Sequence, residues 1–200
     1  MKKILSIILV SVMLMAVTVT SSAATTHTVE KGDSLWKIAV RYQVGLSEIK
    51  AANPTIKNYD LIYPGQVINI STVSSSVTAF EAEVVRLVNE IRVGRGLNPL
   101  THDWQLSRVA RYKSQDMKDL GYFSHTSPTY GSPFEMMKKF GITYRTAGEN
   151  IAKGYATPEA VVNAWMNSSG HRANILNSSY THIGVGYVAS GNYWTQMFKS

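Results

Sequence analysis

The chain of 200 residues contains no cysteine. This absence excludes a disulfide framework, a thiolate metal site and a cysteine nucleophile, and with them the peptidases that pair cysteine with histidine. Charged residues are few, at 16% of the chain, whereas 44% of the residues are hydrophobic. That balance is typical of a globular protein and not of a disordered one. The length predicts one or two domains.

Basic residues outnumber acidic ones and give a formal net charge of +7, but they form no cluster. After the amino-terminal segment, Lys138-Lys139 is the only adjacent basic pair, and aromatic residues do not interleave with a basic stripe. Nucleic-acid binding is therefore not expected. A moderate positive charge instead favours loose attraction to anionic wall polymer or to a phospholipid surface, so weak lipid binding stays an open alternative.

Residues 1–24 have the pattern of a secretory signal peptide. Two lysines precede an apolar run from Ile4 to Val19, and small residues follow up to Ala24. A transmembrane anchor is the alternative, but the run is short for the ~20 apolar residues that cross a bilayer, and no stop-transfer charges follow it. We therefore predict cleavage after Ala24 and a secreted protein, either extracellular or associated with the cell wall or envelope.

A short polar stretch divides the remaining chain. Residues 71–79, STVSSSVTA, are mostly small and polar and show no periodicity, which is typical of a linker. The sequence therefore predicts a small unit at 25–70, a linker at 71–79 and a larger domain at 80–200.

The small unit has the pattern strand, helix, helix, strand. An alternating strand is predicted over 27–30, and a helix capped by Asp33 or Ser34 follows it. A second helix begins at Ser47 and stops before a proline, and a last strand ends at Ile70. We therefore predict a βααβ unit, whose core is thin at this size.

Three segments of this unit carry a specific pattern: VEKGDSLWKIA at 29–39, ANP at 52–54 and IYPGQ at 62–66. The pattern resembles the LysM module, which implies binding of N-acetylglucosamine-containing glycans such as peptidoglycan in a groove between two loops. Backbone amides and polar side chains would bind the acetamido and hydroxyl groups, while Ile and Tyr cover the apolar sugar face. Trp36 is predicted to lie in the core. The predicted glycan-binding residues are Gly32, Asp33, Ser34 and Leu35 in the first loop, and Asn53, Pro54, Ile56, Leu61, Ile62 and Tyr63 in the second.

In the larger domain, helices come first and a hairpin closes the fold. Apolar residues at helical spacing predict a helix from Phe80, and Asp103 caps a second one. Shorter helices begin at Pro133 and Pro158, and alternation from Ile183 predicts a β-hairpin. The predicted fold class is therefore α+β. The predicted apolar face of the second helix comprises Leu106, Val109, Ala110, Met117 and Leu120.

Four polar side chains of this domain suggest a site: His125, Glu135, Glu149 and His171. His125 lies in a loop between turn-forming residues, Glu149 follows a glycine that permits close backbone approach, and His171 follows a glycine at a helix end. The segments around them resemble the bacterial branch of the CAP superfamily, also called SCP-like. The resemblance implies an α-β-α sandwich whose cleft carries two histidines and two acidic residues. Its motifs are GYFSHTSP at 121–128, AGENIA at 147–152, AWMNSSGHRANIL at 164–176, IGVG at 183–186 and YWTQ at 193–196.

The fourth position of this predicted tetrad departs from the family pattern. Animal members place an acidic residue in the helix before the last histidine, where this chain has Asn167 and Ser168. Glu135, in the helix from Pro133, is the candidate replacement. Animal members also contain disulfides, which this chain lacks. Some members bind a divalent metal through the histidines, which implies His125 and His171, with Glu149 as a further candidate ligand.

Three interpretations of the tetrad compete. Two imidazoles and a carboxylate can bind Zn²⁺ or another divalent cation and leave one position open. Glu149 and Glu135 can instead act as acid and base on a glycosidic bond, as in a peptidoglycan-modifying hydrolase. A hydrogen-bonded cluster that only orders the cleft is the third interpretation. Because the chain has no H-E-x-x-H, G-x-S-x-G or H-x-H motif, we favour ligand binding or structure over catalysis, and leave enzyme activity undecided.

The sequence as a whole predicts a secreted, cell-wall-associated monomer. A LysM module would anchor a CAP domain to peptidoglycan, and the His/Glu cleft of the CAP domain would bind a ligand or a divalent metal. No organic cofactor is expected. A structural protein of spore or envelope assembly is a further alternative.

Overall fold

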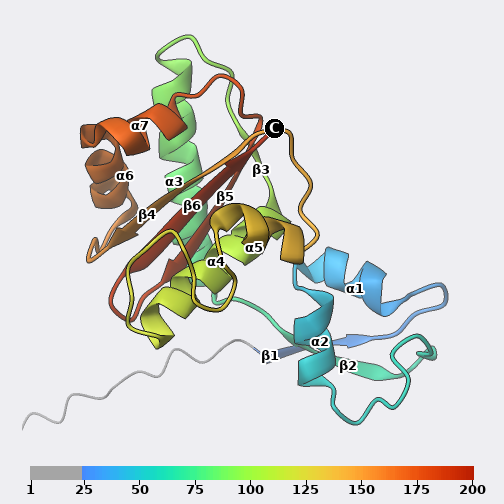
Figure 1. Ribbon diagram of the computed structural model, residues 1–200. Helices are drawn as coiled ribbons and strands as arrows, with labels where there is room; N and C mark the ends of the chain where they lie inside the picture. The colour runs from blue at the N-terminus through green and yellow to red at the C-terminus, as the bar shows by residue number, and fades with distance from the viewer. Residues whose placement is uncertain (1–23) are drawn as a thin grey trace, which may run out of the picture.

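A computed structural model describes residues 24–200, so the predicted signal peptide lies almost entirely outside the described residues. The described chain forms a small and a large domain that lie side by side (Figure 1). Among residues 24–200, no helix is long and apolar enough to cross a membrane.

The small domain has the predicted order of strand, helix, helix and strand. It comprises β1 (Ala24–Thr28), α1 (Leu35–Tyr42), α2 (Leu46–Ala52) and β2 (Val67–Ser71). The two strands pair antiparallel, with Thr26 opposite Asn69. The side chain of Ser34 caps α1, as predicted, by accepting a hydrogen bond from the backbone of Lys37. The first strand begins three residues before the predicted start at His27.

The core of the small domain contains only aliphatic residues, and Trp36 is not among them. Its buried members are Val29, Leu35, Ile38, Ala39, Val44, Ile49, Ile68 and Ile70. Trp36 is 54% exposed, so the prediction that it is a core residue is wrong. Leu35, Ile38 and Ala39 already fill the inner face of α1, and the residue after Leu35 points about 100° away from it around the helix.

The segment between the two domains is shorter than the predicted linker. Ser71 is still paired in β2, and α3 (Ser75–Val93) begins well before the predicted start at Phe80. The side chain of Ser74 accepts a hydrogen bond from the backbone of Val77 and caps this helix. Only residues 72–74 thus join the two domains without regular structure. Ser74 caps the helix, and the rest of the predicted linker, residues 75–79, forms the beginning of α3.

The large domain has three layers, as the resemblance implied. A four-stranded sheet has the order β3-β5-β6-β4, in which β3 runs parallel to β5 and the other neighbours are antiparallel. In Figure 1, α3, α6 and α7 lie on one face of the sheet and α4 and α5 on the other. The strands are β3 (Thr101–His102), β4 (Ala147–Lys153), β5 (His182–Val188) and β6 (Tyr193–Lys199), and the remaining helices are α4 (Trp104–Asp119), α5 (Pro133–Lys139), α6 (Pro158–Asn167) and α7 (Ser169–Ile175).

Each face of the sheet has its own hydrophobic core. Ile183, Val185 and Trp194 pack with Trp165 beneath α3 and α6, whereas Met197 packs beneath α4 and α5. The strand β5 alternates these large residues with glycines. A Cβ atom at Gly184 or Gly186 would collide with the backbone of α4, so the glycines let this helix lie directly on the sheet.

Three details of the large domain differ from the sequence prediction. No strand was predicted over 147–153, where β4 forms one edge of the sheet. The helix from Pro158 ends at Asn167, and a separate helix carries His171. Leu120, predicted to face inward, is 56% exposed because α4 ends at Asp119 and the chain turns away.

Candidate functional site

His125 and Glu149 meet at the edge of the sheet. His125 belongs to the loop between α4 and α5, and Glu149 lies on the edge strand β4. Nδ1 of His125 lies 2.7 Å from Oε1 of Glu149, which is hydrogen-bond distance. When Glu149 is ionised, its carboxylate only accepts hydrogen bonds, so His125 donates from Nδ1 and the Nε2 lone pair of a neutral ring is free. The side chain of His125 is 52% exposed and therefore open to a ligand.

The carboxyl group of Glu149 is buried, and its side chain is only 2% exposed. Within the described residues, Oε2 of Glu149 has no hydrogen-bond partner. Burial raises the pKa of Glu149, while the hydrogen bond with His125 and the positive charge of Lys113 act in the opposite direction. A buried polar atom without a partner is costly and rare. A buried carboxyl oxygen without a partner, beside the exposed imidazole of His125, is typical of a functional site.

The backbone of His171 is tied to the strand that carries Glu149. His171 lies on α7, and burial lowers its pKa, with the positive charge of His125 acting in the same direction. The backbone carbonyl of His171 accepts a hydrogen bond from Nδ2 of Asn150, at 3.1 Å. Asn150 follows Glu149 on β4, so the same strand holds both histidine-bearing segments. A lowered pKa keeps His171 neutral at pH 7 and its lone pair free to bind.

A buried amide cluster fixes α7 to the strand that carries Glu149. Nδ2 of Asn174 donates to Oδ1 of Asn150 at 2.8 Å and to the carbonyl of Glu149 at 3.1 Å. Asn150 in turn donates to Oε1 of Gln196 on β6, at 3.0 Å. Nε2 of Gln196 is the second buried side-chain atom without a partner in the described part of the chain. The cluster therefore gives the backbone carbonyl of Glu149 a hydrogen-bond donor, while Nε2 of Gln196 is a donor without an acceptor in the described residues.

A buried lysine holds the loop of His125 from below. Lys113 on α4 is 1% exposed, and its Nζ donates to the carbonyls of Ser124 at 2.7 Å and His125 at 3.0 Å. A third hydrogen bond, at 3.0 Å, joins Nζ to the hydroxyl of Tyr122. A buried ammonium group is stable only when such partners surround it. The position of His125 thus depends on three hydrogen bonds from one side chain.

Asp116, about one helical turn after Lys113, holds the other half of the same loop. Its carboxylate accepts hydrogen bonds from the hydroxyls of Ser127 and Thr129, both at 2.6 Å, and from the hydroxyl of Tyr122. Although burial acts to raise the pKa of Asp116, these hydrogen bonds and the charge of Lys113 lower it overall. Lys113, Tyr122 and Asp116 form one continuous network between α4 and the loop that carries His125.

The structure does not join Glu135 to the other three residues of the predicted tetrad. Glu135 is exposed on α5, and its Oε2 accepts hydrogen bonds from the backbone and the hydroxyl of Ser132, at 2.7 and 2.8 Å. Ser132 Oγ accepts from the backbone of Glu135 at 3.2 Å, which completes a capping box. In residues 24–200, no hydrogen bond or ion pair links Glu135 to His125, Glu149 or His171. Its carboxylate stabilises a helix start, and the site contains one buried carboxylate.

The donor atoms at the site fit two metal ligands better than three. The described residues contain no group of three or more His, Cys, Asp or Glu side chains placed to hold one ion. Glu149 instead lies behind His125, where a carboxylate orients the ring and raises the basicity of its outer nitrogen. Of the three candidate ligands named from the sequence, Glu149 is thus placed to support the ring of His125.

The predicted glycan-binding residues of the small domain fall into two groups. Within the second predicted loop, Leu61 and Tyr63 are 52% and 58% exposed. Ile56 and Ile62 are half-buried against the core of the small domain. In the first loop, Leu35 is 3% exposed and belongs to the core. The members that are open to solvent are Gly32, Ser34, Pro54, Leu61 and Tyr63.

The two polar side chains that seemed most suited to glycan binding are occupied by the fold. The carboxylate of Asp33 lies 2.7 Å from Nε2 of His27 and also accepts a hydrogen bond from the backbone of Glu30. Asn53 is 3% exposed and bridges α2 and β2 through three hydrogen bonds, each 2.8 Å long, to the backbone of Ile49 and Asn69. The predicted residues that stay open on this surface therefore include Ser34, Leu61 and Tyr63.

Sequence reasoning missed Lys113, Asp116, Asn150 and Gln196. A signal for Lys113 was present, because it lies at helical spacing between Ala110 and Met117, on the face predicted to be apolar. A lysine on a face that packs against the core must either be buried with hydrogen-bond partners or interrupt the apolar face of the helix. No such signal marks Asn150 or Gln196, since polar residues are expected on strands with one open face.

Family models match both domains. The model of the cysteine-rich secretory protein family, CAP, matches residues 85–198, and the model of the LysM domain matches residues 27–71.

Curated relatives come from Bacillus and Staphylococcus. YkwD of Bacillus subtilis, an uncharacterized protein, is 68% identical over 124 residues, which cover 62% of this chain and 48% of YkwD. YlbC, an uncharacterized membrane protein of the same organism, is 39% identical over 79% of this chain and 48% of YlbC. The N-acetylmuramoyl-L-alanine amidase sle1 of Staphylococcus epidermidis is 38% identical over 34% of this chain and 20% of the amidase. The chain thus spans about half the length of the first two relatives.

Solved structures share the fold of the large domain. An extracellular protein of Bacillus anthracis with an SCP domain is similar with a TM-score of 0.60 and 34% identity, over 68% of this chain and 47% of that one. An outer surface protein of Borrelia burgdorferi aligns with a TM-score of 0.55 and 23% identity, over 58% of this chain and 89% of that one. The second of these supports the fold alone.

Proposed function

Because the chain belongs to the cysteine-rich secretory protein family, CAP, and carries a LysM domain before its CAP domain, we propose that it is a cell-wall-associated binding protein. The LysM domain holds N-acetylglucosamine-containing peptidoglycan, and residues 1–24 direct secretion. The site of His125, Glu149 and His171 binds a polar ligand, for which a divalent cation is the best candidate. The observation that supports this site most strongly is the buried Glu149 carboxyl, with one oxygen on His125 and the other unpartnered.

The small domain offers exposed apolar side chains where a sugar ring can lie. Leu61 and Tyr63 project from the loop before β2, although burying them would be favourable. Exposed apolar side chains suit an amino sugar, whose ring has an apolar face. The similarity of part of this chain to an enzyme named for N-acetylmuramoyl-L-alanine supports the same class of glycan.

Retention on purified peptidoglycan tests the LysM role. We expect residues 25–200 to sediment with sacculi, and the double variant Leu61→Ala, Tyr63→Ala to stay in solution. Val67→Ala is the matched control, because Val67 is 56% exposed on β2 of the same domain and is not one of the predicted glycan-binding residues. Equal retention of wild type and the double variant would refute the role of this loop.

The CAP site has the donor set of a weak, open divalent site. His125 and His171 supply neutral imidazoles, which suit Zn²⁺, and solvent or a second ligand would complete the coordination. Glu149 would act from behind His125 by fixing its tautomer and ring orientation. The bound cation would supply Lewis acidity or a bridge to an anionic ligand.

Calorimetric titration with Zn²⁺ tests this site. Wild type should release or absorb heat on binding, and the double variant His125→Ala, His171→Ala should not. His182→Ala is the matched control, because His182 contacts Thr181 at the start of β5 and no residue of the site. The same binding isotherm for all three proteins would refute the assignment.

A hydrolase that uses Glu149 and Glu135 as a pair receives no support from the geometry. The carboxylate of Glu135 is held in its capping box, so the site contains one carboxylate where acid and base need two.

A further inference from the structure

The tryptophans of this chain divide sharply into two kinds. There are 4 in all, and Trp165 and Trp194 are buried in the core, at 1% and 0% exposure. Trp36 on α1 is 54% exposed, and Trp104, the first residue of α4, is half-buried. Both of these line the same groove of about 510 Å³ between the LysM and CAP domains. Each domain thus contributes its non-core tryptophan to one shared surface.

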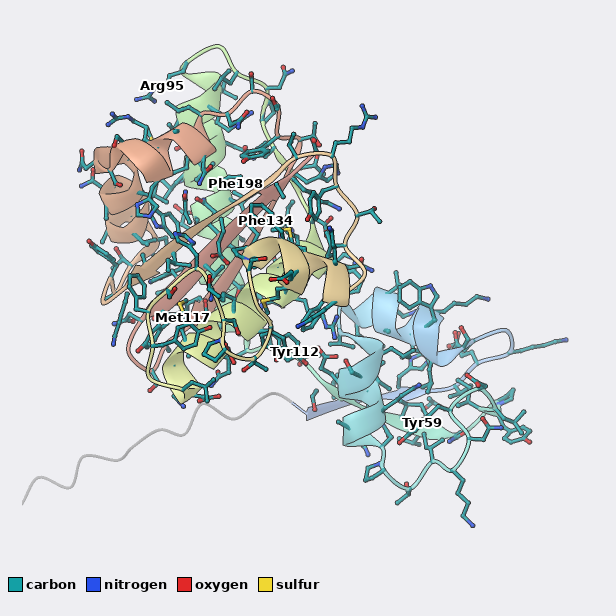
Figure 2. The ribbon with its side chains drawn as sticks, viewed as in Figure 1. Tyr59, Arg95, Tyr112, Met117, Phe134 and Phe198 are labelled. Atoms are coloured by element: carbon teal, nitrogen blue, oxygen red, sulfur yellow. The ribbon has the colours of Figure 1, made fainter. Side chains whose placement is uncertain are left out.

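The groove is built on a fixed contact between the domains. Arg108 of α4 donates to Oε2 of Glu48 and to the hydroxyl of Ser47 on α2, both at 2.8 Å. Its guanidinium group also lies over the rings of Tyr112 and Phe140, at 5.4 and 5.2 Å from their centres. Tyr112 lies where the two domains meet (Figure 2). The walls of the groove are therefore held in place before a ligand arrives.

The lining suits a sugar that carries negative charge. Trp36, Trp104 and Phe140 give aromatic surface, and Gln105 gives an amide. Lys139 also lines the groove, and its Nζ contacts only the carbonyl of Tyr130 among the hydrogen bonds of the described chain. The charge of Arg108 is matched by Glu48, whereas Lys139 is in none of the ion pairs of the described chain, and exposed Glu135, one turn earlier on α5, is the carboxylate that its charge reaches. Flat aromatic faces cover apolar sugar faces, and a spare ammonium group attracts a carboxylate.

We propose that this interdomain groove binds a second stretch of the peptidoglycan strand, an amino-sugar oligosaccharide that bears carboxylates. Trp36 and Trp104 lie against sugar faces, and Lys139 pairs with a carboxylate of the muramic acid or of its peptide. This inference rests on the proposed glycan binding by the LysM domain and extends it, because residues of the CAP domain take part. The ligand would then be longer than the LysM loops alone can cover, and the anion would favour peptidoglycan over a neutral glycan.

Tryptophan fluorescence tests the groove on the intact chain, residues 25–200. The probe is a tetrasaccharide of alternating N-acetylglucosamine and N-acetylmuramic acid, and neutral N-acetylglucosamine tetrasaccharide is the comparison. Because Trp165 and Trp194 are buried, iodide quenches Trp36 and Trp104 selectively. We expect the acidic tetrasaccharide to protect them from iodide. Trp104→Ala should weaken binding about five- to tenfold, while Trp104→Tyr should keep most of it.

Two further variants separate the groove from the LysM loops. Lys139→Gln should weaken binding of the acidic tetrasaccharide and leave binding of the neutral one unchanged. The double variant Leu61→Ala, Tyr63→Ala should weaken both. If only the loop variant lowers affinity, and Trp104→Ala binds like wild type at an unchanged melting temperature, the groove is refuted and the LysM role stands. If neither saccharide binds wild type, the proposed glycan binding fails as well.

Discussion

Nζ of Lys113 donates a hydrogen bond to the backbone carbonyl of His125, at 3.0 Å, from a side chain that is 1% exposed. The exposed ring of His125 therefore depends on a buried charge on α4. On the other side of the ring, Oε1 of Glu149 fixes Nδ1. The open nitrogen of His125 is thus oriented from two directions, by a helix and by a strand that lie far apart in the sequence.

Replacement of Lys113 by methionine should loosen the loop of His125. Methionine keeps the apolar stem but leaves the carbonyls of Ser124 and His125 without their donor. We expect the free energy of unfolding to fall by ~1–3 kcal/mol, measured by chemical denaturation, and the loop amides to exchange faster with solvent. Lys118→Met is the control, because Lys118 pairs with Asp119 on the surface of the described chain and the loss of such an exposed pair should cost little. Equal effects of the two substitutions would contradict the clamp.

The Asp116 network should give the protein a distinct loss of stability in acid. Although burial opposes them, hydrogen bonds from Ser127 and Thr129 lower the pKa of Asp116 below 3.8. The folded state therefore binds this proton less tightly than the unfolded state. The contribution of Asp116 is complete above 3.8 and is lost as the pH falls through its lowered pKa. Asp116→Asn should be less stable than wild type at pH 7, and the difference should shrink as the pH falls below about 4, in melting experiments across this range. A constant difference would exclude Asp116 as the cause.

The sequence predicted the order of the elements well and the contacts of polar residues poorly. Helical spacing and capping residues predicted α1 and α4, because local chemistry decides where a helix begins. The capping pattern also explains one error. Glu135 matched the expectation for a second carboxylate, yet Ser132 three residues earlier is the other half of a capping box. The spacing of Ser132 and Glu135 in the sequence is therefore a better indication of a capping box than of a second carboxylate at the site.

Other features depend on tertiary contacts that no local pattern encodes. Asn53 is a plausible sugar ligand by residue type, but its amide bridges α2 and β2, which are distant in the sequence. Trp36 is apolar, but Leu35, Ile38 and Ala39 occupy the face of α1 that packs on the core, so Trp36 lies on the face toward solvent. The convergence of His125, Glu149 and His171 came from the family resemblance, because a loop, a strand and a helix contribute one residue each.

Glu149→Gln should separate stability from ligand binding. Burial raises the pKa of Glu149 above 4.5. Ionisation of Glu149 therefore opposes folding as the pH rises from 4.5 through this raised pKa. Glutamine removes this cost and still offers an oxygen to Nδ1 of His125. We expect the free energy of unfolding at pH 7 to stay equal or rise, while Zn²⁺ affinity falls about 10- to 100-fold. A clear loss of stability with unchanged Zn²⁺ affinity would show that Glu149 is structural only.

Gly45→Ala should disturb the contact between the domains. The backbone of Gly45 has φ −77°, so alanine fits the local conformation and would by itself stabilise the chain slightly. A Cβ atom there would meet the ends of two flexible side chains, the guanidinium group of Arg108 and the carboxylate of Glu48, which would have to move aside. We expect a larger radius of gyration in small-angle scattering, since the displaced ion pair no longer holds the domains together.

The control for that variant is Gly170→Ala, because a Cβ atom at Gly170 meets nothing within 4 Å. Its scattering curve should match that of wild type. A compact Gly45→Ala protein would mean that Arg108 does not set the arrangement of the domains.

Wall binding without hydrolysis is tested most directly by one incubation of residues 25–200 with purified peptidoglycan, in which the pellet and the supernatant are both measured. We expect the protein in the pellet, and we expect mass spectrometry to detect no released glycan or peptide fragments. Protein that stays in the supernatant would contradict the wall-binding role. Fragments that wild type releases and Glu149→Gln does not would show that the site is catalytic and that binding alone is the wrong description.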